Sequence, residues 1–485
     1  MGVTTSKPLP DGVSLFSREF AEKHERQIRE MEERKTPKKP EVKIVARAIY
    51  KPNARDYTRR RVFGSEQEYG IIPDSWGFRN RTAGYFLENG GRLYLDCSHP
   101  EYASPEASNP LEAIVFDKAG ELIVQRDVLA QGLRLFKNNR DIEGNLYGSH
   151  ESYSLRRSSM GALANFMVPF LTTRIIFCGA GIINKNGEYE LSQRADKICS
   201  AVSQDTTCDR PIFNTRDETL GDANKLMRMH VISGDANLSE TALFLKYGTA
   251  GLVLDLFEDG KIPRLAIHCP ENAIKSISRD LEFKQRYEVE INGFWKNRTA
   301  IDVQRTYLEL AEKSYRGRDA MTDFILDKWN ATLDALAQNP MQLSREIDWV
   351  IKMNLMNGYM RKTGKTLQDS SLRDIDLQYH ELGTGFFQML QGKGLVERLI
   401  TDEAIEHASL NPPSDTRAWI RGKAVAKGIK VEWNSIGICE FKEIVCQGCS
   451  KHCVKEKGSI TEIDNPLDNY SELEKELAKN GEGAK

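Results

Sequence analysis

Two short segments near the start of the chain alternate polar and apolar residues, and this alternation constrains the fold most. Arg61 to Ile71 and Gly91 to Asp96 follow the pattern, with turn-forming Pro, Asp, Ser and Gly residues between them. In an extended strand every second side chain lies on the same face, so Glu66 lies with Glu68. On the second segment the shared face carries Arg92, Tyr94 and Asp96.

The carboxylates on these faces predict a site for a cation. Two like charges on one face repel each other unless a cation neutralises them. Oxygen ligands suit Mg²⁺, which commonly binds together with the phosphates of a nucleotide. The alternation alone leaves a solvated polar face equally open. The motif HPEY directly after the second segment adds His99 and Glu101 at a strand end, where binding groups often lie.

Length and composition indicate a multidomain globular protein. The 485 residues predict two or three domains, and 40% hydrophobic residues supply a normal core. A net charge of −2 argues against nucleic acid as a partner. The sequence contains neither an apolar run long enough to span a membrane nor an N-terminal apolar signal region, so we expect a cytoplasmic protein without membrane contact.

The order of expected elements favours an α+β fold, because strands and helices mix without regular βαβ alternation. We expect strands at Arg174 to Cys178 and Leu252 to Leu256, and helices at Ala300 to Ser314 and Ala320 to Ala337. Neither a P-loop motif nor GxGxxG occurs, so strand-borne side chains and metal would have to hold any nucleotide.

The predicted units are an extension over 1–58 with an amphipathic helix at Ser17 to Arg34, a main domain over 59–393, a small C-terminal domain over 394–460 and a polar acidic tail over 461–485.

Four of the nine cysteines cluster near the C-terminus. Their spacing suits zinc or an iron–sulfur cluster, and free thiols are the alternative. The members are Cys439, Cys446, Cys449 and Cys453. Another group is expected to consist of small core residues, namely Cys178, Cys199, Cys208 and Cys269.

A series of motifs occurs in order between Arg59 and Trp433. It comprises GSEQEYG, NGGRLYLDCSHPEYASPE, DKAGE, LFKNN, YGSHESY, LTTRIIFCGAG, LSQRAD, RPIFNTRDE, MHVISGDANLSE, REIDWVIK, DIDLQYH and SDTRAW. This series resembles the family of Pup ligase and depupylase. The resemblance implies a fold related to glutamine synthetase, in which a curved antiparallel sheet forms a cradle with packed helices, plus a small C-terminal domain.

The resemblance also implies an activity. A ligase of this family uses ATP and Mg²⁺ to join the C-terminal Glu of a small disordered Pup-like modifier to a lysine of a target protein, through an acyl phosphate. Such conjugation belongs to a ubiquitin-like pathway of proteasomal protein degradation. A depupylase instead hydrolyses the isopeptide bond or deamidates a C-terminal Gln. Two further alternatives are a non-catalytic metal- and partner-binding protein and a small-molecule amidoligase.

Matching the family motifs residue by residue implies the site. Asp96 matches the catalytic aspartate that accepts a proton. The implied magnesium ligands are Glu66, Tyr94 and Glu101, with Glu68 adjacent and His150 and His230 on the metal or phosphate side. The implied nucleotide contacts are Arg92, Ser104, Arg228 and Trp433.

The length between two of the motifs favours the ligase branch. The depupylase carries a long insertion there, whereas only 18 residues, Ile72 to Asn89, separate the first acidic strand from GGRLYLD here. LFKNN, CGAG and REIDWVIK also resemble the ligase. The spacing after Asp96 together with SPE, DKAGE and SDTRAW resembles the depupylase.

Overall fold

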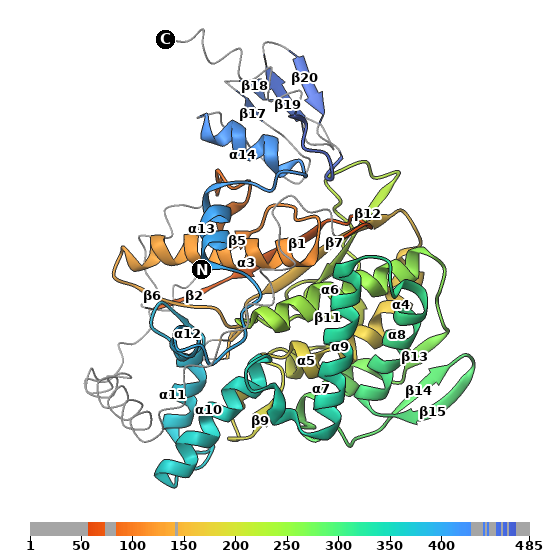
Figure 1. The fold of residues 1–485 in the computed structure, drawn as a ribbon, viewed down its shortest axis with the longest axis vertical. Coiled ribbons are helices and arrows are strands. Elements are labelled where there is room, and N and C mark those ends of the chain that lie inside the picture. Colours follow the sequence, from red (N-terminus) through yellow and green to blue (C-terminus); the bar gives the residue numbers. More distant parts are fainter. Residues whose placement is uncertain are drawn as a thin grey trace, which may run out of the picture. The chain divides into compact units, whose positions relative to one another are not determined.

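The computed structural model describes residues 57–72, 84–140, 144–427 and 465–471, together with the backbone of short strands between 440 and 462. These residues all belong to one compact unit, Ile44–Lys485, drawn in Figure 1. The predicted N-terminal helix, Trp433 and the side chains of the four-cysteine cluster lie outside this description. Within the described part of the chain, every helix is too short or too polar to cross a bilayer.

The centre of the fold is an eight-stranded sheet in the order β10-β11-β12-β7-β1-β5-β4-β3. All neighbours pair antiparallel except β10 and β11, which run parallel. Its strands are β1 (Phe63–Glu68), β3 (Tyr85–Phe86), β4 (Arg92–Asp96), β5 (His99–Ala103), β7 (Ser149–Arg156), β10 (Ser200–Ser203), β11 (Pro211–Asn214) and β12 (Leu226–Val231). The sheet confirms the predicted strand Gly91 to Asp96 as β4 and most of the predicted strand Arg61 to Ile71 as β1, whereas the end of the latter segment belongs to β2 (Gly70–Ile72) in another sheet.

One face of this sheet packs against helices, and the other carries the polar side chains. The packed helices include α3 (Pro110–Leu129), α4 (Met160–Thr173) and α6 (Glu240–Glu258). Phe63 of β1 is fully buried, and its ring lies edge-on to those of Tyr153 in β7 and Tyr247 in α6. Because side chains alternate along a strand, Glu66 points to the opposite face.

Several helices begin at residues whose side chains cap the first turn. Asn109 accepts a hydrogen bond from the Glu112 N–H at the start of α3, and Thr299 and Asp302 form a capping box. The other helices are α5 (Ile175–Cys178), α7 (Pro270–Arg279), α8 (Ala300–Tyr315), α9 (Ala320–Gln338), α10 (Asp348–Thr363), α11 (Ser370–Tyr379), α12 (Phe386–Gly392), α13 (Asp402–Leu410) and α14 (Ala418–Ala426), with 3₁₀ turns η2 (Ala195–Lys197) and η3 (Pro340–Leu343). The predicted helices at 300–314 and 320–337 are confirmed by α8 and α9.

The other described strands form smaller sheets. One is formed by β13 (Leu265–Ile267), β14 (Tyr287–Ile291) and β15 (Phe294–Arg298), and another by β16 (Glu381–Leu382), β6 (Arg134–Phe136) and β2 (Gly70–Ile72). The remaining pairs are β8 (Ile182–Ile183) with β9 (Tyr189–Glu190), β17 (Glu440–Phe441) with β18 (Ile444–Val445), and β19 (Cys453–Glu456) with β20 (Ser459–Glu462).

Two predicted strands are wrong. Leu252 to Leu256 lie inside α6, a helix buried around almost its whole circumference, and a fully apolar run does not distinguish such a helix from a buried strand. Arg174 ends α4, and Ile175–Cys178 form α5.

The cysteine expectation is also wrong for most of its members. Cys178 is buried, as expected, but three of the others are exposed: Cys199, Cys208 and Cys269. The residue type alone does not reveal that these three lie in surface turns and strand ends. The predicted unit boundaries at 58, 393 and 460 stay predictions.

Candidate active site

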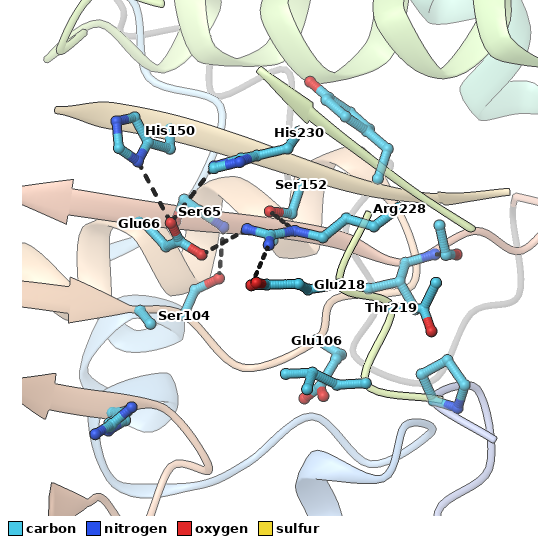
Figure 2. A pocket seen from close by; sticks show the side chains of 18 of the residues that line it. Ser65, Glu66, Ser104, Glu106, His150, Ser152, Glu218, Thr219, Arg228 and His230 are labelled. Carbon is cyan, nitrogen blue, oxygen red and sulfur yellow. Dashed lines mark hydrogen bonds and ion pairs between the residues drawn. The ribbon is translucent and has the colours of Figure 1, made fainter. Parts of the chain in front are cut away.

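A cavity of about 610 Å³ lies on the polar face of the main sheet. This volume is within the range of sites that bind small molecules. Strands β1, β4, β5, β7 and β12 supply most of its floor. Among the predicted site residues, those that line it are Glu66, Arg92, Tyr94, Asp96, Glu101, Ser104, His150, Arg228 and His230. Figure 2 labels Glu66, Ser104, His150, Arg228 and His230.

Glu66 is the centre of a first polar cluster. The register of β1 and β7 pairs it with His150, whose Nδ1 lies 3.4 Å from a Glu66 oxygen. From β12, Arg228 donates to Glu66 at 2.9 Å, and His230 Nε2 lies 3.6 Å from the carboxylate. Figure 2 shows these three side chains converging on Glu66. One carboxylate oxygen and a nitrogen from each histidine lie within 4.8 Å of one another.

The protonation states of Glu66 and His230 leave both side chains able to bind a metal ion. Burial raises the pKa of Glu66, but Arg228 and the two histidines outweigh burial and hold this pKa well below its usual range. Burial and Arg228 lower the pKa of His230 to about 4, so its imidazole is neutral at pH 7. Neither ring nitrogen of His230 has a hydrogen-bond partner among the described residues, although the side chain is buried. A buried neutral imidazole with a free lone pair is suited to bind a metal ion.

Glu68, Asp96 and Glu101 form a second cluster of carboxylates only. The register places Glu101 opposite Glu68 on one side and opposite Tyr94 on the other. One oxygen from each carboxylate lies within 4.8 Å of the others. Burial, Glu66 and Glu68 together raise the pKa of Glu101 well above its usual range. Among the described residues, no Lys or Arg forms an ion pair with any member of this cluster, so its charge is left for an external cation.

The backbone of Gly148 fixes Glu68 within this cluster. Its N–H donates to the Glu68 carboxylate at 2.8 Å, and Glu68 itself is buried, with only 8% of its surface exposed. A side chain at position 148 would lie 2.6 Å from the same carboxylate oxygen. A larger residue here would therefore displace the Glu68 carboxylate and the His150 ring from these positions.

The other predicted residues have mixed environments. Tyr94 donates its phenol hydrogen to Glu101, and burial and Glu101 raise the pKa of Tyr94, so it faces the cluster as a neutral phenol. The guanidinium of Arg92 lies 4.8 Å from the centre of the Tyr94 ring. Ser104 accepts a hydrogen bond from the Ser65 N–H at 2.9 Å, so its hydroxyl also joins β5 to β1.

Sequence reasoning missed an ion cluster on the cavity wall. Glu106 accepts hydrogen bonds from Arg417 at 2.7 Å and from Arg421, and all three side chains are buried. Burial raises the pKa of Glu106, but the two guanidinium groups outweigh burial and hold it below its usual range. SPE and SDTRAW contain Glu106 and Arg417, but nothing in either motif predicts that they meet.

A loop between β11 and β12 also lines the cavity and was not predicted as part of the site. Arg216 donates to Glu218 at 2.9 Å, and Glu218 lies 3.9 Å from Arg228. Thr219 and Leu220 follow on the same wall. The polar composition of the motif NTRDE is typical of a cleft lining, and it is the sequence feature that could have indicated this loop.

Comparisons with known proteins decide the family. A family model described as "Pup-ligase protein" matches residues 19–436. The chain belongs to the Pup-ligase family. A Pup–protein ligase of Actinosynnema mirum is 40% identical over 425 residues, covering 77% of this chain and 92% of its own. A depupylase of Acidothermus cellulolyticus is 40% identical over 379 residues, covering 73% of this chain and 75% of its own.

Solved structures of Pup ligases share the fold. The complex of the prokaryotic ubiquitin-like protein Pup and its ligase PafA matches with a TM-score of 0.77 and 32% identity, over 88% of this chain and 93% of the ligase. PafA in complex with ADP matches with a TM-score of 0.73 and 30% identity, over all of this chain and 97% of that one. These matches confirm the predicted family and the α+β fold related to glutamine synthetase-like ligases, and the chain is an enzyme of the ligase type. The zinc interpretation of the four cysteines gains no support from them.

Proposed function

We propose that this Pup-ligase family member joins the C-terminal Glu of a Pup-like modifier to lysine side chains of target proteins, using ATP and Mg²⁺. The observation that supports this most is the pair of polar clusters, Glu66 with two histidines and Glu68 with Asp96 and Glu101. Every member except the buried Glu68 lines one nucleotide-sized cavity. The solved structures of relatives in complex with ADP and with Pup agree with a nucleotide and a protein modifier as substrates.

The donor set fits Mg²⁺. Carboxylate oxygens are its preferred protein ligands. Burial raises the pKa of Glu101 most, and the neighbouring Glu66 and Glu68 raise it further, a repulsion that a divalent cation would relieve. Glu66, Glu68 and Glu101 would hold the ion, with His150 and His230 beside it. Bound there, the ion would neutralise charge on the phosphates of ATP.

The remaining side chains have separate roles in the proposed reaction. Arg228, held between Glu66 and Ser152 at 2.9 and 3.0 Å, presents its positive charge to the transferring phosphoryl group. Transfer of the γ-phosphoryl group to the modifier's side-chain carboxylate gives ADP and an acyl phosphate. The lysine amine then attacks the acyl carbon, phosphate leaves, and Asp96, which is exposed to the cavity, accepts the amine proton.

Depupylase activity is the second candidate, because a depupylase is also 40% identical to this chain. One experiment separates the two functions. The chain is incubated with ATP, Mg²⁺, a modifier ending in Glu and a lysine-bearing target, and separately with a preformed conjugate. We expect a covalent adduct and stoichiometric ADP. Cleavage of the conjugate without adduct formation would establish the depupylase instead, and adduct formation with a free amino acid alone would indicate a small-molecule ligase.

A further inference from the structure

A short segment near the C-terminus, Asn465 to Ser471, forms part of the wall of the cavity. Pro466 is buried and lines the cavity together with Arg417 and Leu220. The family model ends at residue 436, so this segment lies beyond the matched region.

Hydrogen bonds attach the segment to the residues that precede α14. The Arg417 N–H donates to the Pro466 carbonyl at 3.2 Å, and the Asn469 side chain donates to the Ser414 carbonyl at 2.9 Å. The Asn465 N–H donates to the hydroxyl of Tyr470 at 2.9 Å, which closes the segment on itself. The segment is thus attached at two points, the carbonyl of the buried Pro466 and the side chain of Asn469.

Arg417 connects the segment to the ion cluster formed by Glu106, Arg417 and Arg421. The Arg417 side chain donates to Glu106 and to the Leu220 carbonyl, and Glu106 also pairs with Arg421. The Thr416 hydroxyl donates to the Glu106 carbonyl at 2.8 Å. A shift of the segment would therefore act on a wall built from four separate parts of the chain.

This wall lies on the side of the cavity away from the metal-binding side chains. Figure 2 shows Glu106 and Thr219 on one side of the pocket and Glu66 and His150 on the other. Carboxylates and histidines suit a metal ion and phosphates. The opposite wall instead combines flat, apolar and guanidinium surfaces, the combination on which a planar base stacks, from Phe86, Leu220, Pro466, Arg417 and Arg421.

We propose that Asn465 to Ser471 closes the base end of the nucleotide site and slows nucleotide release, with Pro466 as the contact and Asn469 as a positioning residue. This inference rests on the proposed function in one respect, namely that a nucleotide occupies the cavity. It adds that nucleotide retention depends on a segment that follows the residues matched by the family model.

Two truncated chains test the proposal against the full chain. One ends at Asp464 and lacks the segment, and its matched control ends at Ser471 and keeps it. ADP affinity is measured by calorimetry with Mg²⁺, and KM for ATP, KM for the modifier and kcat are measured in the ligation assay. We expect the chain ending at Asp464 to bind ADP about tenfold more weakly, the scale of one or two lost contacts, and to show a similar rise in KM for ATP. Its kcat and its KM for the modifier should stay within about twofold, and the control should match the full chain.

Equal ADP affinity in the two truncated chains would overturn the proposal. If the chain ending at Asp464 does not fold, as judged by circular dichroism, Pro466→Gly and Asn469→Ala in the full chain replace it. A drop in ADP affinity at unchanged kcat then supports the proposal, and unchanged affinity in both variants overturns it. The full chain serves as a separate test of the proposed function: if it does not bind ADP, that function fails, and this inference fails with it.

Discussion

Glu101 and Glu106 are five positions apart in the sequence, both are buried, and both line the same cavity, yet their surroundings are opposite. Two guanidinium groups of the chain neutralise Glu106, and they hold its pKa down against the effect of burial. Glu101 faces two further carboxylates instead, and burial and these neighbours raise its pKa. A buried carboxylate with its own cations stabilises the fold, whereas one without them is left to bind a cation from outside.

The largest expected effect is on turnover, at the exposed member of the carboxylate cluster. Asp96→Asn removes the proposed proton acceptor without changing the shape of the side chain. We expect kcat for ligation to fall about 10²- to 10⁴-fold while ADP affinity stays within about threefold. The exposed Glu282, paired with Lys284 on the surface, gives the control Glu282→Gln. Unchanged turnover in Asp96→Asn would remove this aspartate from the reaction.

The next effect is on stability, at the neutralised carboxylate. Glu106→Gln leaves Arg417 and Arg421 buried without their counter-charge, so we expect the free energy of unfolding to fall by about 3–5 kcal/mol in urea titrations. Glu312→Gln, which removes a surface pair with Arg316, should cost less than about 1 kcal/mol. If both substitutions cost the same, the two guanidinium groups do not depend on Glu106.

A smaller effect of opposite sign is expected at Glu101. Glu101→Gln removes one of several mutually repelling charges and keeps an acceptor for the Tyr94 hydroxyl. Without metal at pH 7, we expect the free energy of unfolding of Glu101→Gln, measured in urea, to exceed that of the unsubstituted chain by about 1 kcal/mol. The reason is that one unit of raised pKa corresponds to about 1.4 kcal/mol. Destabilisation on the scale of Glu106→Gln would show that Glu101 is a structural residue after all.

The smallest effect is a pH dependence. Because the folded pKa of Glu106 lies below its ordinary value of 4.5, its stabilising contribution is present above pH 4.5 and is lost as the pH falls toward the folded pKa. Between pH 6 and pH 4 we expect this residue to account for about 0.8 kcal/mol of lost stability, measured as the difference between the unsubstituted chain and Glu106→Gln. Parallel pH profiles for the two chains would contradict this assignment. Glu101 acts in the opposite direction, because a raised carboxyl pKa costs stability as the pH rises.

The comparison also shows what the sequence could reveal. Strand alternation predicted that Glu66 and Glu68 share a face of one segment and that Arg92, Tyr94 and Asp96 share a face of the other, because the two-residue period is a local property of an extended chain. It could not predict that Glu106 meets Arg417, which lies 311 positions away. Nor could it predict that the apolar run at Leu252 to Leu256 is a buried helix, because periodicity vanishes when every face of an element is covered.

The most direct test concerns the unneutralised carboxylates. ADP is titrated calorimetrically into the unsubstituted chain and into Glu101→Gln, each with Mg²⁺ and with EDTA, at pH 7. If these carboxylates hold the ion that accompanies the nucleotide, Mg²⁺ strengthens ADP binding at least tenfold, about 1.4 kcal/mol, in the unsubstituted chain, and much less in Glu101→Gln. Equal affinity with and without Mg²⁺ in the unsubstituted chain would contradict the assignment of this cluster to a metal ion.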